Sequence, residues 1–584
     1  MFKPPSCSLV GLAWAALAGV SANAPGQFPA DFLVEDMVGR GAQMFVGWRR
    51  LESAGRAVGS GDVNADGFRD LLITSTGAET SWGGDLPGVV YVVFGGPTLE
   101  GQSVISLNDL DGTNGFRIEH HDPYANFGRG LIADVDVNRD GLDDFVVSAH
   151  GAWALGQPAA GQVYVIYGAP GLGATGTFKL LTLNGSNGFV INGPGRGQGT
   201  GSLLGAGDFN ADGWTDLGMY ASGVGGRGRI YVLWGRSGLG SAGVVNLGQL
   251  APGEAMRVDG LLAGDGFGPL SPRSGDPNAD GMDDLLLGAS LASPNGIYRA
   301  GQVYVVFGRR GLEQLEYFPL NELNGSNGYV INGSSPEMGL GGRLAAVGDV
   351  NDDGHDDIMM SSSSPSSNIL LFGGPGVGAS GIIEAWQIEG DRGFQLYRSS
   401  SLFGPAGDVN HDGVADLMTG LLDYDASRRY MAGVLYGQAG LGPGGALDPP
   451  LLDPRALDGT RRFLVRSTQV ANRLGLFGGI GDIGDLNSDG MNDVVVTDVA
   501  YSLPGPIRRQ EGAVYVIFGR RLGDLDLDAD VDLADFLIFA QCFAGAGAPP
   551  TPACPTNIVA DLDYDGDVDL ADFLIFQQNF TGSR

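Results

Sequence analysis

Short apolar runs, separated by turns rich in glycine and asparagine, dominate the hydrophobic pattern of this chain. One kind of run is rich in Val, Ile and Tyr and ends in Gly; examples are Val89 to Gly95, Val163 to Gly168 and Val303 to Gly308. A second kind is aromatic, such as Phe116 to Ile118. Runs of this length and composition, bounded by turn residues, are typical of β-strands. No helical period interrupts them in the repeated part of the chain, so the pattern predicts an all-β protein.

An acidic nine-residue motif divides the chain into repeats. The pattern D-x-N-x-D-G-x-x-D begins at Asp62, Asp136, Asp208, Asp276, Asp349, Asp408 and Asp485, at steps of 59 to 77 residues. Strand-like runs surround each copy in the same order, which predicts four antiparallel strands per repeat. Such sheets cannot bury their faces alone, but they do so when they are arranged radially. We therefore predict a seven-bladed β-propeller of four-stranded blades over residues 25–523.

The two ends of this region predict how the ring closes. The last repeat has a third strand at Val514 to Phe518, but no fourth strand follows it. Near the other end, Met44-Phe45-Val46 precedes the first acidic motif. We expect an N-terminal strand at about residues 44–48 to complete blade 7 and join the last blade to the first.

The acidic motif also predicts a metal site in every blade. Oxygen ligands at positions 1, 3, 5 and 9, a backbone carbonyl at position 7 and a glycine at the sharp turn are the features of a hard-cation loop. Ca²⁺ suits these flexible oxygens better than Mg²⁺, which keeps its waters. The predicted ligands are Asp62, Asn64, Asp66, Asp70, Asp136, Asn138, Asp140, Asp144, Asp208, Asn210, Asp212, Asp216, Asp276, Asn278, Asp280, Asp284, Asp349, Asn351, Asp353, Asp357, Asp408, Asn410, Asp412, Asp416, Asp485, Asn487, Asp489 and Asp493. The alternative is a set of metal-free turns, which Asp, Asn and Gly also favour.

The repeats resemble the FG-GAP repeats of integrin α-subunit propellers and their bacterial relatives. The resemblance rests on the seven motifs and on Phe-Gly pairs such as Phe127-Gly128 and Phe267-Gly268, and it covers roughly residues 40–519. It implies calcium in the loops between strands 1 and 2 of each blade. It also implies cell adhesion or ligand binding on the opposite face, where we expect Trp82, Tyr124, Trp153, Tyr298, Tyr424 and Tyr501.

The first 24 residues read as a secretory signal. Lys3 gives a weakly basic start, Leu9 to Val20 are apolar, and Ala22-Asn23-Ala24 suits cleavage after a small residue. We therefore expect a secreted protein without a membrane span. Cys542 and Cys554 are the two cysteines outside this segment, and an oxidising compartment makes a disulfide between them the default expectation.

Residues 524–584 form a second predicted domain with an internal duplication. Two Asp-rich loops, each followed by Phe-Leu-Ile-Phe at helical spacing, resemble EF-hand loops that lead into short helices. Their predicted calcium ligands are Asp524, Asp526, Asp528, Asp532, Asp535, Asp561, Asp563, Asp565, Asp569 and Asp572, which brings the expected number of Ca²⁺ sites to about nine.

This duplication resembles a type I dockerin, a module that docks secreted proteins onto cohesin-bearing scaffolds, often in polysaccharide-degrading assemblies. The resemblance implies a cohesin-like or surface partner. Carried over by position, the partner-binding residues are Leu533, Ala534, Leu570 and Ala571. The alternative is that Leu533 and Leu570 pack inside the domain.

The charge of the chain adds one exclusion and one explanation. The 584 residues carry 67 acidic and 34 basic side chains, a net charge of −33. Such a chain repels phosphate backbones, so we expect no nucleic acid partner. Positions 1, 5 and 9 of the seven propeller loops hold 21 Asp and the two C-terminal loops hold 12 more, and the remaining 34 acids balance the 34 bases. The excess negative charge is therefore concentrated in the predicted cation sites.

The same loops leave few residues for catalysis. The sequence contains no nucleophile motif with a base at usable spacing and no phosphate-binding loop. We therefore expect no catalytic residues and no enzyme, but a calcium-binding adhesion or ligand-binding propeller. Its partner would be a protein or glycan on the face opposite the loops. The alternatives are a hydrolase of a polysaccharide-degrading assembly, with its site on the propeller, and an architectural spacer.

Overall fold

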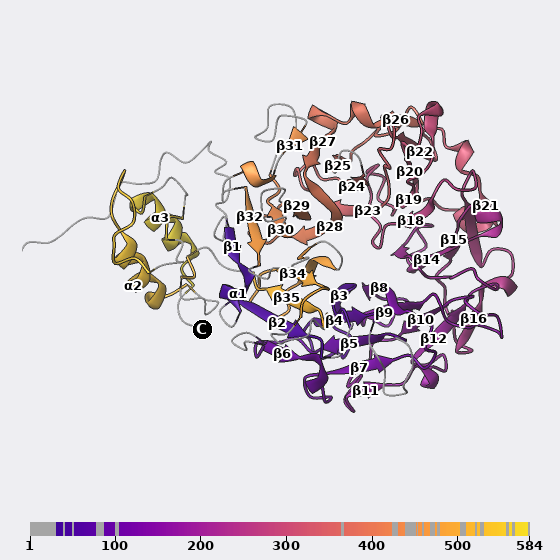
Figure 1. The fold of residues 1–584 in the computed structure, drawn as a ribbon, viewed down its shortest axis with the longest axis horizontal. Helices are drawn as coiled ribbons and strands as arrows, with labels where there is room; N and C mark the ends of the chain where they lie inside the picture. The colour runs from indigo at the N-terminus through magenta and orange to yellow at the C-terminus, as the bar shows by residue number, and fades with distance from the viewer. Residues whose placement is uncertain are drawn as a thin grey trace, which may run out of the picture.

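The fold is a ring of seven β-sheets, which confirms the predicted all-β, seven-bladed propeller (Figure 1). The computed structural model describes residues 31–38, 41–48, 52–77, 87–99, 104–363, 367–422, 430–438, 451–452, 454–457, 461–467, 474–475, 479–502, 510–519, 523–525, 531–555, 560–562 and 567–581. The predicted signal at residues 1–24 lies outside this range. No helix in the described part of the chain is long and apolar enough to cross a membrane.

Each blade has four antiparallel strands and a fifth, parallel strand at its outer edge. In order from the inner edge, the strands are β3 Val58–Gly61, β4 Asp70–Ser75, β5 Val89–Val93, β7 Gly115–Glu119 and β11 Thr177–Phe178 in blade 1; β8 Phe127–Val135, β9 Asp144–Ala149, β10 Gln162–Ile166, β12 Gly188–Asn192 and β16 Val244–Asn246 in blade 2; β13 Leu204–Gly207, β14 Asp216–Ala221, β15 Arg229–Leu233, β17 Ala255–Asp259 and β21 Tyr317–Phe318 in blade 3; and β18 Phe267–Leu270, β19 Leu285–Ala289, β20 Gln302–Val306, β22 Gly328–Asn332 and β26 Ile382–Glu384 in blade 4. They continue as β23 Leu344–Gly348, β24 Asp357–Ser362, β25 Ser367–Leu371, β27 Gly393–Tyr397 and β31 Leu451–Leu452 in blade 5; β28 Ser399–Gly407, β29 Asp416–Leu422, β30 Tyr430–Leu435, β32 Arg462–Arg466 and β1 Asp31–Leu33 in blade 6; and β33 Ile480–Gly484, β34 Asp493–Asp498, β35 Ala513–Ile517, β2 Ala42–Val46 and β6 Val104–Ser106 in blade 7.

The fifth strand of each blade comes from the connection that leads into the fourth strand of the next blade. For example, β11 pairs in parallel with β7 of blade 1, although it lies between β10 and β12 of blade 2. A single helical turn follows each of these strands: η1 Leu107–Asp109, η2 Leu180–Thr182, η4 Leu247–Gln249, η7 Leu320–Glu322, η8 Ala385–Gln387, η10 Pro454–Ala456 and α1 Val34–Met37. Other short turns are η3 Val224–Gly226, η5 Pro294–Gly296, η6 Leu312–Gln314 and η9 Gly390–Arg392. Each blade therefore pairs, through its fifth strand, with a segment of the blade that follows it.

The N-terminal segment closes the ring. β2 pairs antiparallel with β35 as the fourth strand of blade 7, and β1 pairs in parallel with β32 as the fifth strand of blade 6. Alternate side chains of β2 enter two different cores. Met44 and Val46 pack with blade 6, while Phe45 packs with Leu71 and other residues of blade 1. One short strand therefore seals the last blade against both of its neighbours.

The cores lie between blades. The middle strands are buried on both faces; all five residues of β5 and all six of β24 are buried. This burial explains why their sequences are continuous apolar runs instead of alternating ones, since each sheet packs on two others.

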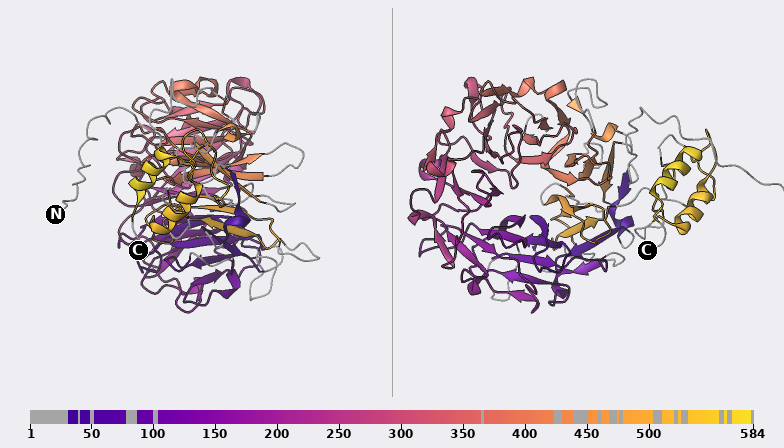
Figure 2. Two further views of the ribbon diagram at one scale, coloured as in Figure 1. Left: turned by 90° about the vertical axis from the view of Figure 1, so that its left-hand side faces the viewer. Right: turned by 180° about the vertical axis from the view of Figure 1, so that it is seen from behind.

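The C-terminal unit contains the two helices α2 Leu533–Cys542 and α3 Leu570–Asn579, and it lies at the rim of the ring beside the last blades (Figures 1 and 2). Asp532 and Asp569 cap the helices, each in a capping box with the third residue of its helix. Phe539 and Phe576 stack in a core shared by both halves. A disulfide joins Cys542 to Cys554.

Loss of this disulfide is expected to destabilise the C-terminal unit alone. The bridge closes a loop with a sequence separation of 12 residues, and releasing a loop of that length lowers the free energy of unfolding by about 3 kcal/mol. Calorimetry of the protein with both cysteines changed to serine should show a lower transition for this unit and an unchanged transition for the propeller. A shift of the propeller transition would contradict this expectation.

Candidate functional site

All seven acidic loops have the same hydrogen-bonded geometry. In blade 5, the carboxylate of Asp349 accepts hydrogen bonds from the backbone N–H groups of Asp353 (3.0 Å) and Gly354 (2.6 Å). Asp353 in turn accepts one from the N–H of His355 at 3.1 Å. The corresponding bonds occur in the other six loops. These are the bonds of an Asx turn, and a metal-free turn also makes them.

The aspartate at position 9 is buried, which an Asx turn does not require. Asp357 is fully buried, and its carboxylate accepts hydrogen bonds from the N–H groups of Val350 (3.0 Å) and Gly373 (2.9 Å). Burial, with a smaller contribution from the nearby carboxylates of Asp353 and Asp349, raises the pKa of Asp357 to about 8 against the lowering effect of the two N–H groups. The other blades repeat this arrangement with a buried or nearly buried Asp70, Asp144, Asp216, Asp284, Asp416 or Asp493.

This arrangement fits a divalent cation. In blade 5, the carboxylates of Asp353 and Asp349 lie near enough to Asp357 to raise its pKa, because like charges repel one another. A cation at their centre would offset the repulsion and keep the buried carboxylate ionised, and hard oxygens are the ligands that Ca²⁺ takes. Blade 4 differs in one detail. Pro277 has no N–H at position 2, and the side chain of Asn278 donates to Asp284 at 2.9 Å in its place.

The C-terminal loops show a partly different ligand set. Asp567, Asp569 and Asp572 form the one group of three acidic side chains within metal-binding distance in the described part of the chain. Asp569 and Asp572 belong to the predicted ligands, but Asp567 was assigned no side-chain role, because position 7 of an EF-hand loop usually binds through its carbonyl. Asp524, Asp532, Asp535 and Asp561 also lie in the described residues. Asp526, Asp528, Asp563 and Asp565 lie outside them.

The side chain at position 8 of the motif, to which the sequence reasoning assigned no role, links five of the seven loops to the preceding blade. Asp143, Asp283 and Asp356 accept hydrogen bonds from the N–H groups of the first loop residue of the blade before, at 2.8 to 2.9 Å. Thr215 donates to the carbonyl of Asp136 at 3.1 Å, and Arg69 donates to the carbonyl of Ile483 at 3.2 Å. These five loops are therefore joined to neighbouring blades of the ring. The residue type at this position varies, so the repeat did not reveal it.

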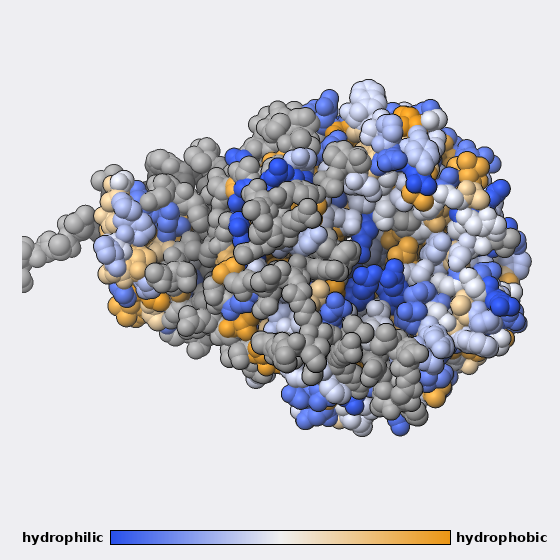
Figure 3. Space-filling view, viewed as in Figure 1, coloured by the Kyte–Doolittle hydropathy of each residue, from blue (hydrophilic) through white to orange (hydrophobic). Residues whose placement is uncertain are grey.

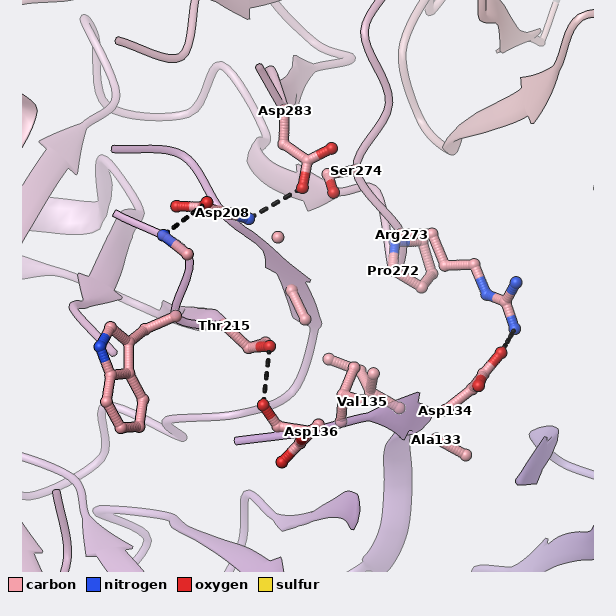
Figure 4. A pocket seen from close by; sticks show the side chains of 15 residues that line it. Ala133, Asp134, Val135, Asp136, Asp208, Thr215, Pro272, Arg273, Ser274 and Asp283 are labelled. Atoms are coloured by element: carbon pink, nitrogen blue, oxygen red, sulfur yellow. Dashed lines mark hydrogen bonds and ion pairs between the residues drawn. The ribbon is translucent and has the colours of Figure 1, made fainter. Parts of the chain in front are cut away.

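A cavity of about 360 Å³ lies between blades 2, 3 and 4 beside two of these loops (Figure 4). Asp136 and Asp208, each the first residue of its loop, line it together with Arg273 and Asp283. Arg273 forms an ion pair with Asp134 at 3.5 Å, and Asp134 also pairs with Arg69 at 2.8 Å. The cavity thus places predicted metal ligands next to a guanidinium group, a combination that suits a phosphoryl group.

The loops away from the acidic motifs expose several of the aromatic residues expected there. Tyr124, Trp153 and Tyr298 are 64%, 57% and 56% exposed. Tyr501 is half-buried. Trp82 and Tyr424 lie outside the described residues.

His120 is buried and neutral. Its Nδ1 accepts a hydrogen bond from the N–H of Asp122 at 3.0 Å, so the proton is on Nε2, which donates to the hydroxyl of Tyr164 at 2.8 Å. The hydroxyl of Tyr164 in turn donates a hydrogen bond to the side-chain oxygen of Gln162. Burial, with a smaller contribution from His121, which stacks on it, lowers the pKa of His120 to about 4.

Acid is expected to destabilise the protein through His120. The native pKa lies below the usual 6.5, so the stabilisation is complete above pH 6.5 and is lost as the pH falls toward 4, by up to about 3 kcal/mol. Chemical unfolding at several pH values should show that the free energy of unfolding of His120→Gln falls less steeply with decreasing pH. The exposed His411, which does not contact His120, provides the control, since His411→Gln should keep the slope of the unchanged protein. Equal slopes for all three proteins would contradict the assignment.

Comparison with known proteins places these features in context. No family model matches the chain. Among curated proteins, it is 24% identical over 430 residues to the phosphatidylinositol-glycan-specific phospholipase D of Bos taurus, covering 68% of this chain and 46% of the relative. The enzyme of the same name from Homo sapiens is 25% identical over 437 residues, covering 69% and 47%. The chain is similar to phospholipases. It spans about half the length of these relatives, and the ring must contain most of the match, since it makes up most of the chain.

These names correct the functional prediction. A non-catalytic adhesion or ligand-binding propeller is wrong, and so is the expectation of no enzyme, because the relatives are named as phospholipases. The polysaccharide hydrolase does not match either, since the name specifies phosphatidylinositol-glycan. The sequence reasoning failed because it treated every acidic loop as structural only. A bound metal ion also polarises phosphoryl groups and activates water, so the same carboxylates can serve catalysis.

Proposed function

We propose that this chain is a hydrolase that acts on phosphatidylinositol-glycan, built on a propeller that binds Ca²⁺. The observation that carries the proposal is the similarity to phosphatidylinositol-glycan-specific phospholipase D over about two thirds of the chain. Since the chain spans about half of those relatives, activity and substrate are both part of the proposal.

We propose the cavity between blades 2, 3 and 4 as the place where the phosphodiester binds. Its geometry supports this choice, because Asp136 and Asp208 belong to adjacent candidate cation loops and Arg273 faces the same space (Figure 4). Arg273 would orient the phosphoryl oxygens, and the acidic residues would hold the metal. A bound cation would supply charge stabilisation for the phosphoryl group.

We also propose that the seven propeller loops are calcium sites of the FG-GAP type. The buried aspartate at position 9, which two further aspartates of its loop approach, supports this proposal. The C-terminal unit would be dockerin-like, with calcium in both of its loops. Leu533 and Leu570 support a role in binding a cohesin-like or surface partner, because they are 68% and 67% exposed instead of packed inside. Export to the cell exterior would agree with the pattern of residues 1–24.

Release of a phosphatidylinositol-glycan-anchored protein from detergent micelles tests the hydrolase. The purified chain with millimolar calcium should move the anchored protein into the aqueous phase, and a chelator should stop the release. Arg273→Gln should lower the rate by about 100-fold, within the range that loss of one charge-stabilising group produces. The exposed Arg310 provides the matched control, because Arg310→Gln should retain full activity. Absence of release at every calcium concentration would refute the proposal.

A further inference from the structure

Three arginines stand at the inner ends of three blades. Arg56 lies two residues before β3 of blade 1, Arg129 lies near the start of β8 of blade 2, and Arg343 directly precedes β23 of blade 5. These strands are the innermost of their sheets, and the acidic loops follow their other ends. The three arginines, called the channel cluster below, are therefore at the end of the central channel opposite the acidic loops. On the face drawn in Figure 3, strongly hydrophilic residues gather at the middle of the ring.

The channel cluster reaches across the ring. Blade 5 is three blades away from blades 1 and 2, the largest separation in a ring of seven, yet Arg343 is near enough to both Arg56 and Arg129 to interact electrostatically. Arg343 is accessible to water, yet much of the protein lies around it, as expected for a channel wall. These surroundings, together with the charges of Arg56 and Arg129, lower its pKa to about 10. Burial and then Arg129 also lower the pKa values of Arg56 and His150.

In the part of the chain that the structure describes, no protein group is paired with these three side chains. Within the described residues, none of the three guanidinium groups forms a side-chain hydrogen bond or an ion pair. Other arginines of the same chain do, as Arg229 does with Asp259 at 2.9 Å. The chain has 33 more acids than bases, so a grouping of three unpaired cations is not a consequence of its composition. Repulsion within the cluster opposes folding unless an anion occupies the space between the side chains.

We propose that the channel cluster is a binding site for a phosphoryl anion, held by Arg56, Arg129 and Arg343. A guanidinium group binds phosphate through two parallel hydrogen bonds, and three such groups from different directions match the three outer oxygens of a phosphate ester. The ligand class is a phosphate ester, either free in solution or as a lipid headgroup. The site lies at the opposite end of the channel from the acidic loops and does not depend on the proposed hydrolase activity.

Thermal unfolding with glycerol phosphate, which contains no bond that the proposed hydrolase would cleave, tests the site. With calcium and ionic strength held constant, glycerol phosphate should raise the unfolding temperature of the unchanged protein above that in chloride. Arg343→Gln should weaken binding by about tenfold or more, as expected for loss of a charged hydrogen-bonding partner, while Arg310→Gln should bind normally. No stabilisation of the unchanged protein, or equal stabilisation of Arg343→Gln, would overturn the proposal.

Two further measurements complete the test. Without ligand, Arg343→Gln should unfold at a higher temperature than the unchanged protein, because the variant relieves repulsion; a lower temperature would argue against a strained cluster. Phosphatidylcholine vesicles with and without phosphatidylinositol distinguish the source of the phosphate. Binding to phosphatidylinositol that glycerol phosphate competes away identifies a lipid headgroup. Binding of glycerol phosphate without vesicle binding identifies a soluble ester.

Discussion

Removing divalent cations with a chelator is expected to lower the unfolding temperature of the propeller by on the order of 10 °C or more. Each acidic loop places two aspartates near one buried aspartate, as Asp349 and Asp353 are placed near Asp357. Calcium bound only by the native state adds about 2.7 kcal/mol per site at 100 times its dissociation constant. Differential scanning calorimetry in calcium and in chelator measures the effect. An unchanged unfolding temperature at millimolar calcium would contradict metal binding in the loops.

The pH dependence should change with calcium as well. In the chelated protein, Asp357 keeps a proton up to about pH 8, whereas the unfolded chain releases it near pH 3.8. The native state then binds more protons, so stability falls as the pH rises between these values. Bound calcium should abolish this decline.

A variant pair separates metal binding from turn geometry. Asp353→Asn in loop 5 should lower the unfolding temperature in calcium but have little effect in chelator, because its carboxylate is needed for the cation and only in part for the turn. Asp391→Asn, at an exposed site outside the loops, should have no effect in either condition. An equal loss for Asp353→Asn in both conditions would indicate a metal-free turn.

Phe45→Ala is expected to lower the free energy of unfolding by about 3 to 5 kcal/mol, the usual result of removing a buried aromatic ring. Phe45 is fully buried in β2, where it packs with Leu71 of blade 1 and Val514 of blade 7. The substitution leaves a cavity at the closure of the ring. Urea unfolding followed by fluorescence would measure the loss.

The control for this prediction lies on the strand that pairs with β2. Val104 in β6 is 52% exposed, so Val104→Ala should change stability by less than about 0.5 kcal/mol. A comparable loss for both variants would show that Phe45 has no special role in closure.

The number of blades could be predicted from the sequence because each acidic motif joins the first two strands of one sheet, so that seven motifs require seven sheets. The fifth strands could not be predicted from the sequence. β11, for example, has two residues, Thr177 and Phe178, and its pairing with β7 depends on a neighbouring blade. Such a strand has no period of its own in the sequence.

The candidate sites also divide into those that the sequence predicts and those that only the folded ring brings together. Ligand positions such as Asp349 and Asp353 are local, so spacing alone brings them together. Arg56 and Arg343 are far apart in the chain and approach only when the ring is closed, and no repeat marks them. The proposed catalysis has no sequence signal of its own, because a metal-binding carboxylate has the same sequence pattern whether its metal holds a turn or activates a substrate.

The closure by β2 has a consequence for how the molecule is made. Residues 42–46 emerge from the ribosome first, but their partner β35 is among the last parts of the ring to be synthesised. During that interval, β2 and the two adjoining blade edges present unpaired backbone groups, which are prone to pair with other chains. Completion of the ring is thus a late, long-range event, and we expect it to be the slow step of refolding.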